Sequence, residues 1–143
     1  MKNNKGHVLS KVEGFTLIEM LVVIAIIGLL SSVVLVALGP SRTKAKDARV
    51  ISNMNQVQVL EETLFNNGTY ASLSLTVEPG LSLENDVKAN NGNTGITIIG
   101  AGGAAAYAAY TSLSSGYYCV DSKGNSVNLT SVTAVIAATP YCK

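Results

Sequence analysis

Residues 15–38 form an apolar run of 24 residues that contains a single charged side chain, Glu19. An α-helix rises about 1.5 Å per residue, so a run of this length crosses the roughly 30 Å hydrocarbon core of a bilayer. The many Phe, Leu, Ile and Val side chains outweigh the cost of one acidic residue near the start of the run. The sequence therefore predicts one membrane-spanning helix, and only the residues after it are available for a soluble core.

The apolar run could instead belong to a cleavable export signal, because Lys2, Lys5 and Lys11 precede it. However, the apolar region of such a signal is usually only about 7–15 residues long. A small-x-small site occurs at Ala37-Leu38-Gly39, but Pro40 follows it directly. Proline fits poorly into a peptidase site that binds extended backbone, so we expect the run to stay attached to the chain.

The two cysteines indicate on which side of the membrane the C-terminal region lies. Basic residues lie on both sides of the apolar run, so the charge rule for orientation is undecided. Cys119 and Cys142 have no CxxC motif and no nearby His to complete a metal set. A disulfide between them would stabilise a small domain by about 3 kcal/mol and would require an oxidising compartment, whereas two buried free thiols are the alternative. The cysteines thus favour a C-terminal region outside the cytoplasm.

The start of the apolar run holds a specific combination of residues, Lys11-Val-Glu-Gly14-Phe15-Thr-Leu-Ile-Glu19. This segment resembles the cleavage and methylation motif of type IV prepilins and pseudopilins, and the resemblance is close over residues 6–40. It implies that Gly14 is the last residue of a leader, that Phe15 becomes the new and N-methylated terminus, and that Glu19 directs assembly. It also implies a leader in the cytoplasm, a membrane-embedded aspartyl prepilin peptidase and a C-terminal domain outside.

Glu19 has a physical role that can be stated without the resemblance. A carboxylate among apolar side chains is costly unless it finds a partner, and ionisable residues inside a membrane are candidates for function. Its partner should be an amine. Cleavage after Gly14 creates an amine at Phe15, which the Glu19 carboxylate of a neighbouring copy could pair with.

Beyond the membrane the pattern predicts that the helix continues to about Asn66. Gly39 and Pro40 should cause a kink or local melting, because proline removes a helical hydrogen bond. One apolar stripe follows at helical spacing: Val50, Met54, Val57, Leu60 and Leu64. Asn66-Asn67-Gly68 then reads as the end of the helix. We expect four segments: a leader at 1–14, the membrane and assembly half of the helix at 15–39, an amphipathic half at 40–66, and a globular region at 67–143.

The globular region is expected to be a small antiparallel sheet. Residues 69–92 are polar, with a turn at Pro79-Gly80, and are predicted to be mostly loop. Strand-like runs follow at 96–99, 104–113, 116–120 and 127–135. Three or four antiparallel strands should cover the apolar stripe. The predicted fold class is α+β and pilin-like, with a long N-terminal helix packed on a small antiparallel sheet.

Composition and motifs argue against several other classes of function. The formal charge is +1, and removal of residues 1–14 would make it −1 (7 basic minus 8 acidic residues), so no nucleic acid partner is indicated. The glycines at 100–103 resemble a nucleotide-binding turn, but only 38 residues follow Ala105, too few for that fold. Asp121–Asn125 is a poor calcium loop because Lys123 occupies a ligand position. The one histidine, His7, lies in the leader. We therefore expect no catalytic residues, no metal and no cofactor.

The sequence favours a structural subunit, a pilin or minor pilin of a type IV filament. Its partners would be copies of itself or other pilins, the prepilin peptidase, the inner-membrane assembly machinery and the membrane. It would begin as a single-pass precursor in the inner membrane and end in an extracellular filament, or in a periplasmic pseudopilus. Two alternatives stay open: a pseudopilin of a type II secretion or DNA-uptake system, and a single-pass anchored binding protein.

Overall fold

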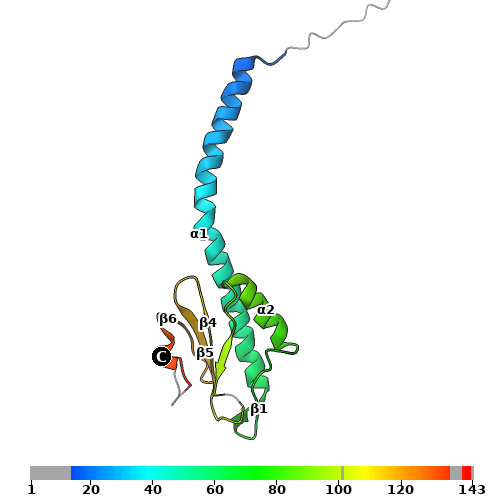
Figure 1. Ribbon diagram of the computed structural model, residues 1–143, viewed down its shortest axis with the longest axis vertical. Helices are drawn as coiled ribbons and strands as arrows, with labels where there is room; N and C mark the ends of the chain where they lie inside the picture. The colour runs from blue at the N-terminus through cyan, green and yellow to red at the C-terminus, as the bar shows by residue number, and fades with distance from the viewer. Residues whose placement is uncertain (1–13, 101, 136–139, 143) are drawn as a thin grey trace, which may run out of the picture. The chain divides into compact units, whose positions relative to one another are not determined.

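A computed structural model describes residues 14–100, 102–135 and 140–142 of the chain (Figure 1). Residues 1–13 of the predicted leader lie outside the described part. The chain divides into two compact units, Met1–Gly39 and Pro40–Lys143.

Helix α1 spans Leu17–Thr63 and supplies residues to both units. From its start to Gly39 every side chain is exposed. The exposed fractions of the large apolar side chains there run from 39% at Leu38 to 82% at Leu17. A helix that is apolar on all sides belongs in a membrane or in the interior of an assembly. This part of α1 is long and apolar enough to cross a membrane, as predicted.

Gly39 and Pro40 lie within the helical residues of α1. The local melting that was one of two expected effects at this point is therefore not found. The other effect, a kink, stays a prediction that rests on the missing proline N–H and on the crowding of the carbonyl of Val36.

The apolar stripe on the second half of α1 is buried as predicted. Val50, Met54 and Val57 are completely buried, and Leu60 and Leu64 are partly buried against the same cluster. Because these positions recur at helical spacing, they place one face of α1 against the rest of the second unit.

A two-residue hairpin turn follows α1, a feature that the sequence interpretation missed. Strand β1 (Phe65–Asn66) pairs with strand β2 (Thr69–Tyr70) in antiparallel register. Asn67 and Gly68 connect them with φ values of 50° and 82°. An Asn-Gly pair with two positive φ angles is the preferred turn of a tight hairpin, so this signal marked a hairpin rather than a helix cap.

Helix α2 spans Gly80–Asn90, where the sequence interpretation placed mostly loop, and that prediction was wrong. Pro79 occupies the N-cap, so Pro79-Gly80 starts a helix instead of making an isolated turn. Leu83 and Val87 are buried at i and i+4. The apolar pair was too short a pattern to stand out among polar neighbours, and tertiary contacts decide the structure of such a segment.

Polar contacts hold α2 against α1 within the second unit. The Asp86 carboxylate accepts hydrogen bonds from Arg49 Nε at 2.7 Å and from Asn53 Nδ2 at 2.6 Å. The hydrogen bond from Arg49, supported by that from Asn53, lowers the pKa of Asp86. Glu84 links α2 to the chain beyond it, because its side chain accepts the Ile96 N–H at 2.7 Å.

The small antiparallel sheet predicted from the sequence is confirmed; it has four strands, in the order β3-β4-β5-β6. The strands are β3 (Thr97–Ile99), β4 (Ala108–Ser112), β5 (Tyr117–Asp121) and β6 (Ser126–Leu129). The last predicted strand is too long, because Val132–Val135 form a 3-10 turn, η1. The Ser131 hydroxyl accepts the Thr133 N–H at 3.3 Å, a local hydrogen bond that competes with extended structure.

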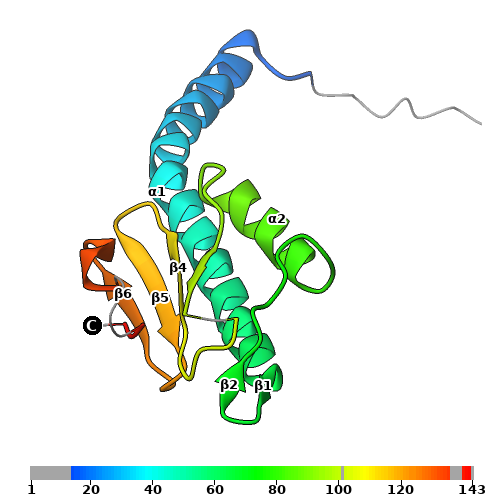
Figure 2. The same cartoon turned by 60° about the horizontal axis from the view of Figure 1, so that its bottom comes forward.

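The core of the second unit lies between the sheet and α1. Ala109, Tyr118 and Val120 pack on the α1 stripe together with Leu83 and Val87 from α2. Ala108, Cys119 and Cys142 form a separate cluster, as expected when successive strand residues point to opposite faces. Figure 2 shows α2 and the sheet on different sides of the C-terminal part of α1.

Candidate assembly and processing site

The N-terminal end of α1 is closed by a reciprocal pair of hydrogen bonds. Thr16 precedes the first helical residue, and its hydroxyl accepts the Glu19 N–H at 3.2 Å. In return, Glu19 Oε2 accepts the Thr16 backbone N–H at 2.7 Å and its hydroxyl at 2.7 Å. This is a capping box, which satisfies two backbone donors that a helix start leaves without helical partners. The Thr-x-x-Glu spacing was readable in the sequence, but its capping role was missed.

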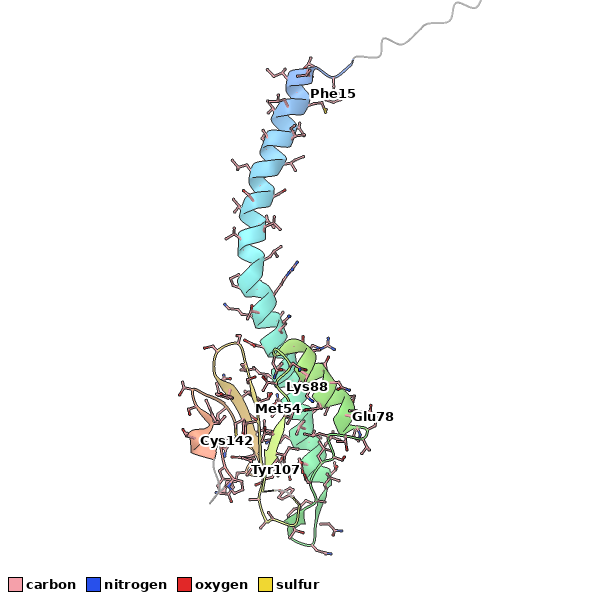
Figure 3. All side chains as sticks on the ribbon, viewed as in Figure 1. Phe15, Met54, Glu78, Lys88, Tyr107 and Cys142 are labelled. Carbon is pink, nitrogen blue, oxygen red and sulfur yellow. A yellow bond between two sulfur atoms is a disulfide. The ribbon has the colours of Figure 1, made fainter. Side chains whose placement is uncertain are left out.

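Gly14 and Phe15 precede the helix and are exposed, and Figure 3 shows Phe15 beside the first turn of α1. Phe15 is 78% exposed, and a Cβ added at Gly14 would meet no atom within 4 Å. Phe15, Ile18, Glu19, Val22 and Val23 line a shallow apolar depression of about 390 Å³. The predicted cleavage and assembly residues are therefore close together at one end of α1.

The disulfide predicted from the sequence is confirmed. Cys119 on β5 is bonded to Cys142, with their Cα atoms 5.8 Å apart. Asp121 strengthens this connection, because its carboxylate accepts the Cys142 N–H at 2.9 Å. The disulfide and the hydrogen bond fasten the C-terminal segment to the sheet.

The segment Asp121–Asn125 is a turn, as the sequence indicated, and the Asp121 carboxylate stabilises it. Asp121 accepts hydrogen bonds from Lys123 N at 2.9 Å, Asn125 N at 3.0 Å and Asn125 Nδ2 at 2.8 Å. Burial alone would raise the pKa of Asp121, but the hydrogen bonds from Asn125, Cys142 and Lys123 together lower it. The carboxylate is thus engaged by the donors of its own turn.

Gly102 and Gly103 lie in the loop between β3 and β4, and their amides donate hydrogen bonds to the β1–β2 hairpin. Gly102 N and Gly103 N donate to the Tyr70 carbonyl at 3.0 and 2.8 Å, and Tyr70 N donates to Ala104 O at 2.8 Å. The glycines are needed here because both φ values are positive, 88° and 100°. These amides connect the β1–β2 hairpin to the sheet.

A cluster of two carboxylates and two tyrosines at the end of α1 was not predicted; Glu61 and the tyrosines Tyr70 and Tyr107 are buried, whereas Glu62 is exposed. Glu61 is completely buried, and its Oε1 accepts the Leu73 N–H at 2.9 Å. Within the described part of the chain, Glu61 Oε2 has no hydrogen-bond partner. Burial raises the pKa of Glu61, and the neighbouring Glu62 raises it further. The only signal in the sequence was that Glu61 continues the helical spacing of Val57 on the buried face of α1. This signal was overlooked because a charged residue is normally assigned to the solvent-exposed surface.

Glu62 connects two tyrosines of this cluster. Tyr70 Oη donates to Glu62 Oε2 at 3.1 Å, and Tyr107 Oη donates to Glu62 Oε1 at 3.4 Å and to the Gln58 carbonyl at 3.2 Å. The tyrosine rings pack edge to face with centroids 4.8 Å apart. Burial, together with the nearby carboxylates, raises the pKa of Tyr107. Among the described residues no three His, Cys, Asp or Glu side chains are grouped so that they could hold a metal ion.

Residues 9–35 match the family model described as the prokaryotic N-terminal methylation motif. That motif is the type IV prepilin signature. Searches for similar curated proteins and for similar solved structures found no match. The prepilin signature supports a protein of type IV pilin or pseudopilin kind, and it points to a structural subunit rather than an enzyme. It implies processing by a prepilin peptidase and polymerisation, and it fits a membrane-anchored precursor together with the apolar part of α1.

Proposed function

We propose that this chain is a pilin or minor pilin that is cut after Gly14, methylated at Phe15 and polymerised into a type IV filament through its N-terminal helix, residues 15–66. The observation that supports this most strongly is the position of Glu19. It is the one charged residue in an exposed apolar helix segment, and it lies one turn from the peptide bond of the proposed cut. The prepilin signature covers the same residues.

The proposed assembly contact is an ion pair between copies. Cleavage frees the amine of Phe15, which must enter an apolar environment when the helices pack together. The Glu19 carboxylate of another copy meets it there and also continues to cap its own helix. Breaking a buried ion pair costs about 3–5 kcal/mol, so loss of the carboxylate at every added subunit should stop growth.

The precursor would lie in the cytoplasmic membrane with residues 1–14 inside and the second unit outside. A prepilin peptidase and the inner-membrane assembly machinery are the proposed partners. The disulfide supports this orientation, because disulfides persist in oxidising compartments.

Two substitutions at Glu19 separate the capping role from the proposed ion pair. Glu19→Gln keeps a side chain that can complete a capping box with Thr16, but it removes the charge. We expect Glu19→Gln and Glu19→Ala to be inserted and cleaved normally and to yield no sheared surface filaments. Thr16→Val, which removes the capping hydroxyl but keeps the charge, should still yield filaments.

The measurement is the amount of subunit in sheared and membrane fractions, with N-terminal mass to verify processing. Filaments at the wild-type level from Glu19→Gln would overturn the proposed ion pair. The signature is shared with pseudopilins, so a processed wild-type chain that is absent from surface filaments but recovered in periplasmic oligomers would favour a pseudopilin. An unprocessed, monomeric chain would favour a simple membrane anchor.

A further inference from the structure

The chain contains two Asn-Asn-Gly segments, Asn66-Asn67-Gly68 and Asn90-Asn91-Gly92. An asparagine that precedes glycine is especially reactive, because the backbone nitrogen of a residue without a Cβ can approach the side-chain amide closely. Asn67 and Asn91 each have an asparagine before them and a glycine after them, so this local sequence gives them equal reactivity. The fold places them in different surroundings.

The Asn91 side chain is fixed by three hydrogen bonds at the end of α2. Its Nδ2 donates to Thr111 Oγ1 at 2.9 Å and to the Ser112 carbonyl at 3.3 Å. Its Oδ1 accepts the Thr94 N–H at 3.1 Å. Thr111 is a buried residue of strand β4. The Asn91 amide therefore cannot turn toward the backbone nitrogen that follows it without breaking these hydrogen bonds.

Asn67 lies at the tip of the β1–β2 hairpin, where it and Gly68 are both exposed. Within the described part of the chain, the Asn67 amide has no hydrogen-bond partner. A Cβ added at Gly68 would meet no atom within 4 Å, so the space around this turn is open. The strands are only two residues long, and Asn66 and Thr69 beside the turn are exposed, so the tip can open locally at little cost.

We propose that Asn67, unlike Asn91, is a site of spontaneous deamidation in the folded protein. The Gly68 backbone nitrogen attacks Cγ of Asn67 and closes a five-membered succinimide ring, while the bond from Cγ to Nδ2 breaks. The amide group leaves as ammonia and takes the proton of the Gly68 nitrogen with it. Water then opens the ring at either of its carbonyl groups, which gives aspartate or isoaspartate at position 67. Water is the only co-reactant.

The reaction adds one negative charge to the hairpin, and isoaspartate also lengthens the main chain by one carbon atom. The two-residue turn has positive φ values at Asn67 and Gly68, 50° and 82°. The longer main chain of isoaspartate does not keep this geometry, so the pairing of Phe65 with Tyr70 should weaken in that product. The inference is independent of the proposed filament, since it requires only the folded chain and water.

The first test incubates the purified full-length chain in detergent at mildly alkaline pH and follows both segments by peptide mass spectrometry. Deamidation replaces NH2 by OH and makes a peptide about 1 Da heavier. The peptide that contains Asn67 should convert about tenfold faster, or more, than the peptide that contains Asn91. In denaturant, with the disulfide reduced, the two peptides should convert at similar rates.

Three results of this test would overturn the proposal. They are equal rates in the folded chain, faster conversion at Asn91, and no conversion at Asn67. An equally large difference in denaturant would also overturn it, because the fold would then not be the cause.

The second test changes the surroundings of each asparagine separately. Thr111→Val removes the hydroxyl that accepts from Asn91 Nδ2 and should accelerate conversion at Asn91, whereas Thr111→Ser keeps the hydroxyl and should behave as the wild type. Acceleration in both variants, or in neither, would contradict the assigned protection of Asn91. Asn67→Gln should remove most of the isoaspartate that an isoaspartyl methyltransferase detects in the aged, folded chain, because a six-membered ring closes more slowly. Undiminished isoaspartate in Asn67→Gln would place the reaction elsewhere and overturn the proposed site.

Discussion

Glu19 and Glu61 lie near opposite ends of α1 and differ in their exposure to solvent. Glu19 is exposed and accepts hydrogen bonds from Thr16. Its importance was already indicated by the sequence, in which it is the one charged residue of the apolar run. Glu61 is buried beside Glu62 with one oxygen unpartnered among the described residues. Sequence reasoning could not find the Glu61 cluster, because Tyr70, Leu73 and Tyr107 approach it only through the tertiary fold.

The raised pKa of Glu61 predicts an unusual dependence of stability on pH. The folded state binds this proton more tightly than the unfolded chain, in which the pKa is about 4.3. The stabilisation is therefore fully present below the unfolded pKa and is lost as pH rises through the folded pKa. Glu61→Gln cannot ionise, so it should gain on the order of 1 kcal/mol at neutral pH relative to the wild type.

The check is the free energy of unfolding of the full chain in detergent between about pH 5 and 7.5. Asp86 and Asp121 have lowered pKa values, so their contributions change only at more acidic pH. The wild type should lose stability towards pH 7.5, and Glu61→Gln should lose less. Glu78→Gln, a change of the same chemistry at an exposed position, should follow the wild type. Parallel curves for all three proteins would contradict the assigned burial of Glu61.

The disulfide gives a second prediction at the scale of residues. Its cysteines are 23 residues apart in sequence, so replacing both Cys119 and Cys142 by Ser should lower the free energy of unfolding by about 3 kcal/mol. Chemical denaturation of the wild-type and double-variant proteins measures this difference. Thiol labelling of the unreduced, unfolded wild type should find no reactive thiol, and two labelled thiols per chain would disprove the bond.

At the scale of elements, the sequence predicted what strong local patterns specify. The apolar run at 15–38 predicted the first half of α1, and the helical spacing of apolar residues predicted its second half. Turn residues marked the separations between the strands of the sheet. Helix α2 was missed because its apolar positions, Leu83 and Val87, are too few to form a clear stripe. Strand β1 was missed because Asn67-Gly68 suits a helix end as well as a hairpin turn.

The packing of α1 can be tested with two changes on different faces of the same helix. Met54 is fully buried, so Met54→Ala should destabilise the second unit by about 2–5 kcal/mol. Val59 is 64% exposed, and Val59→Ala should change the free energy of unfolding by less than about 0.5 kcal/mol. Denaturation of the full chain in detergent, followed by tyrosine fluorescence, gives both values. Similar losses for the two variants would contradict the orientation of the helix.

For the whole molecule, the N-terminal motif and the second unit provide different kinds of information. The prepilin signature occupies residues 9–35 and indicates the kind of protein. The second unit holds the disulfide and the cluster around Glu61, which depend on contacts between residues far apart in sequence. A sequence pattern can thus indicate the kind of protein, whereas contacts between distant residues become visible only in the folded chain.

The central claim is that this chain is cut after Gly14 and built into a surface filament. The most direct test is the mass of the subunit recovered from sheared surface filaments of cells that express the wild-type chain. We predict a mass that corresponds to a chain beginning at Phe15 with its disulfide intact, about 14 Da heavier where the new terminus is methylated. Filaments that lack this subunit, or a subunit that begins at Met1 or Pro40, would contradict the account.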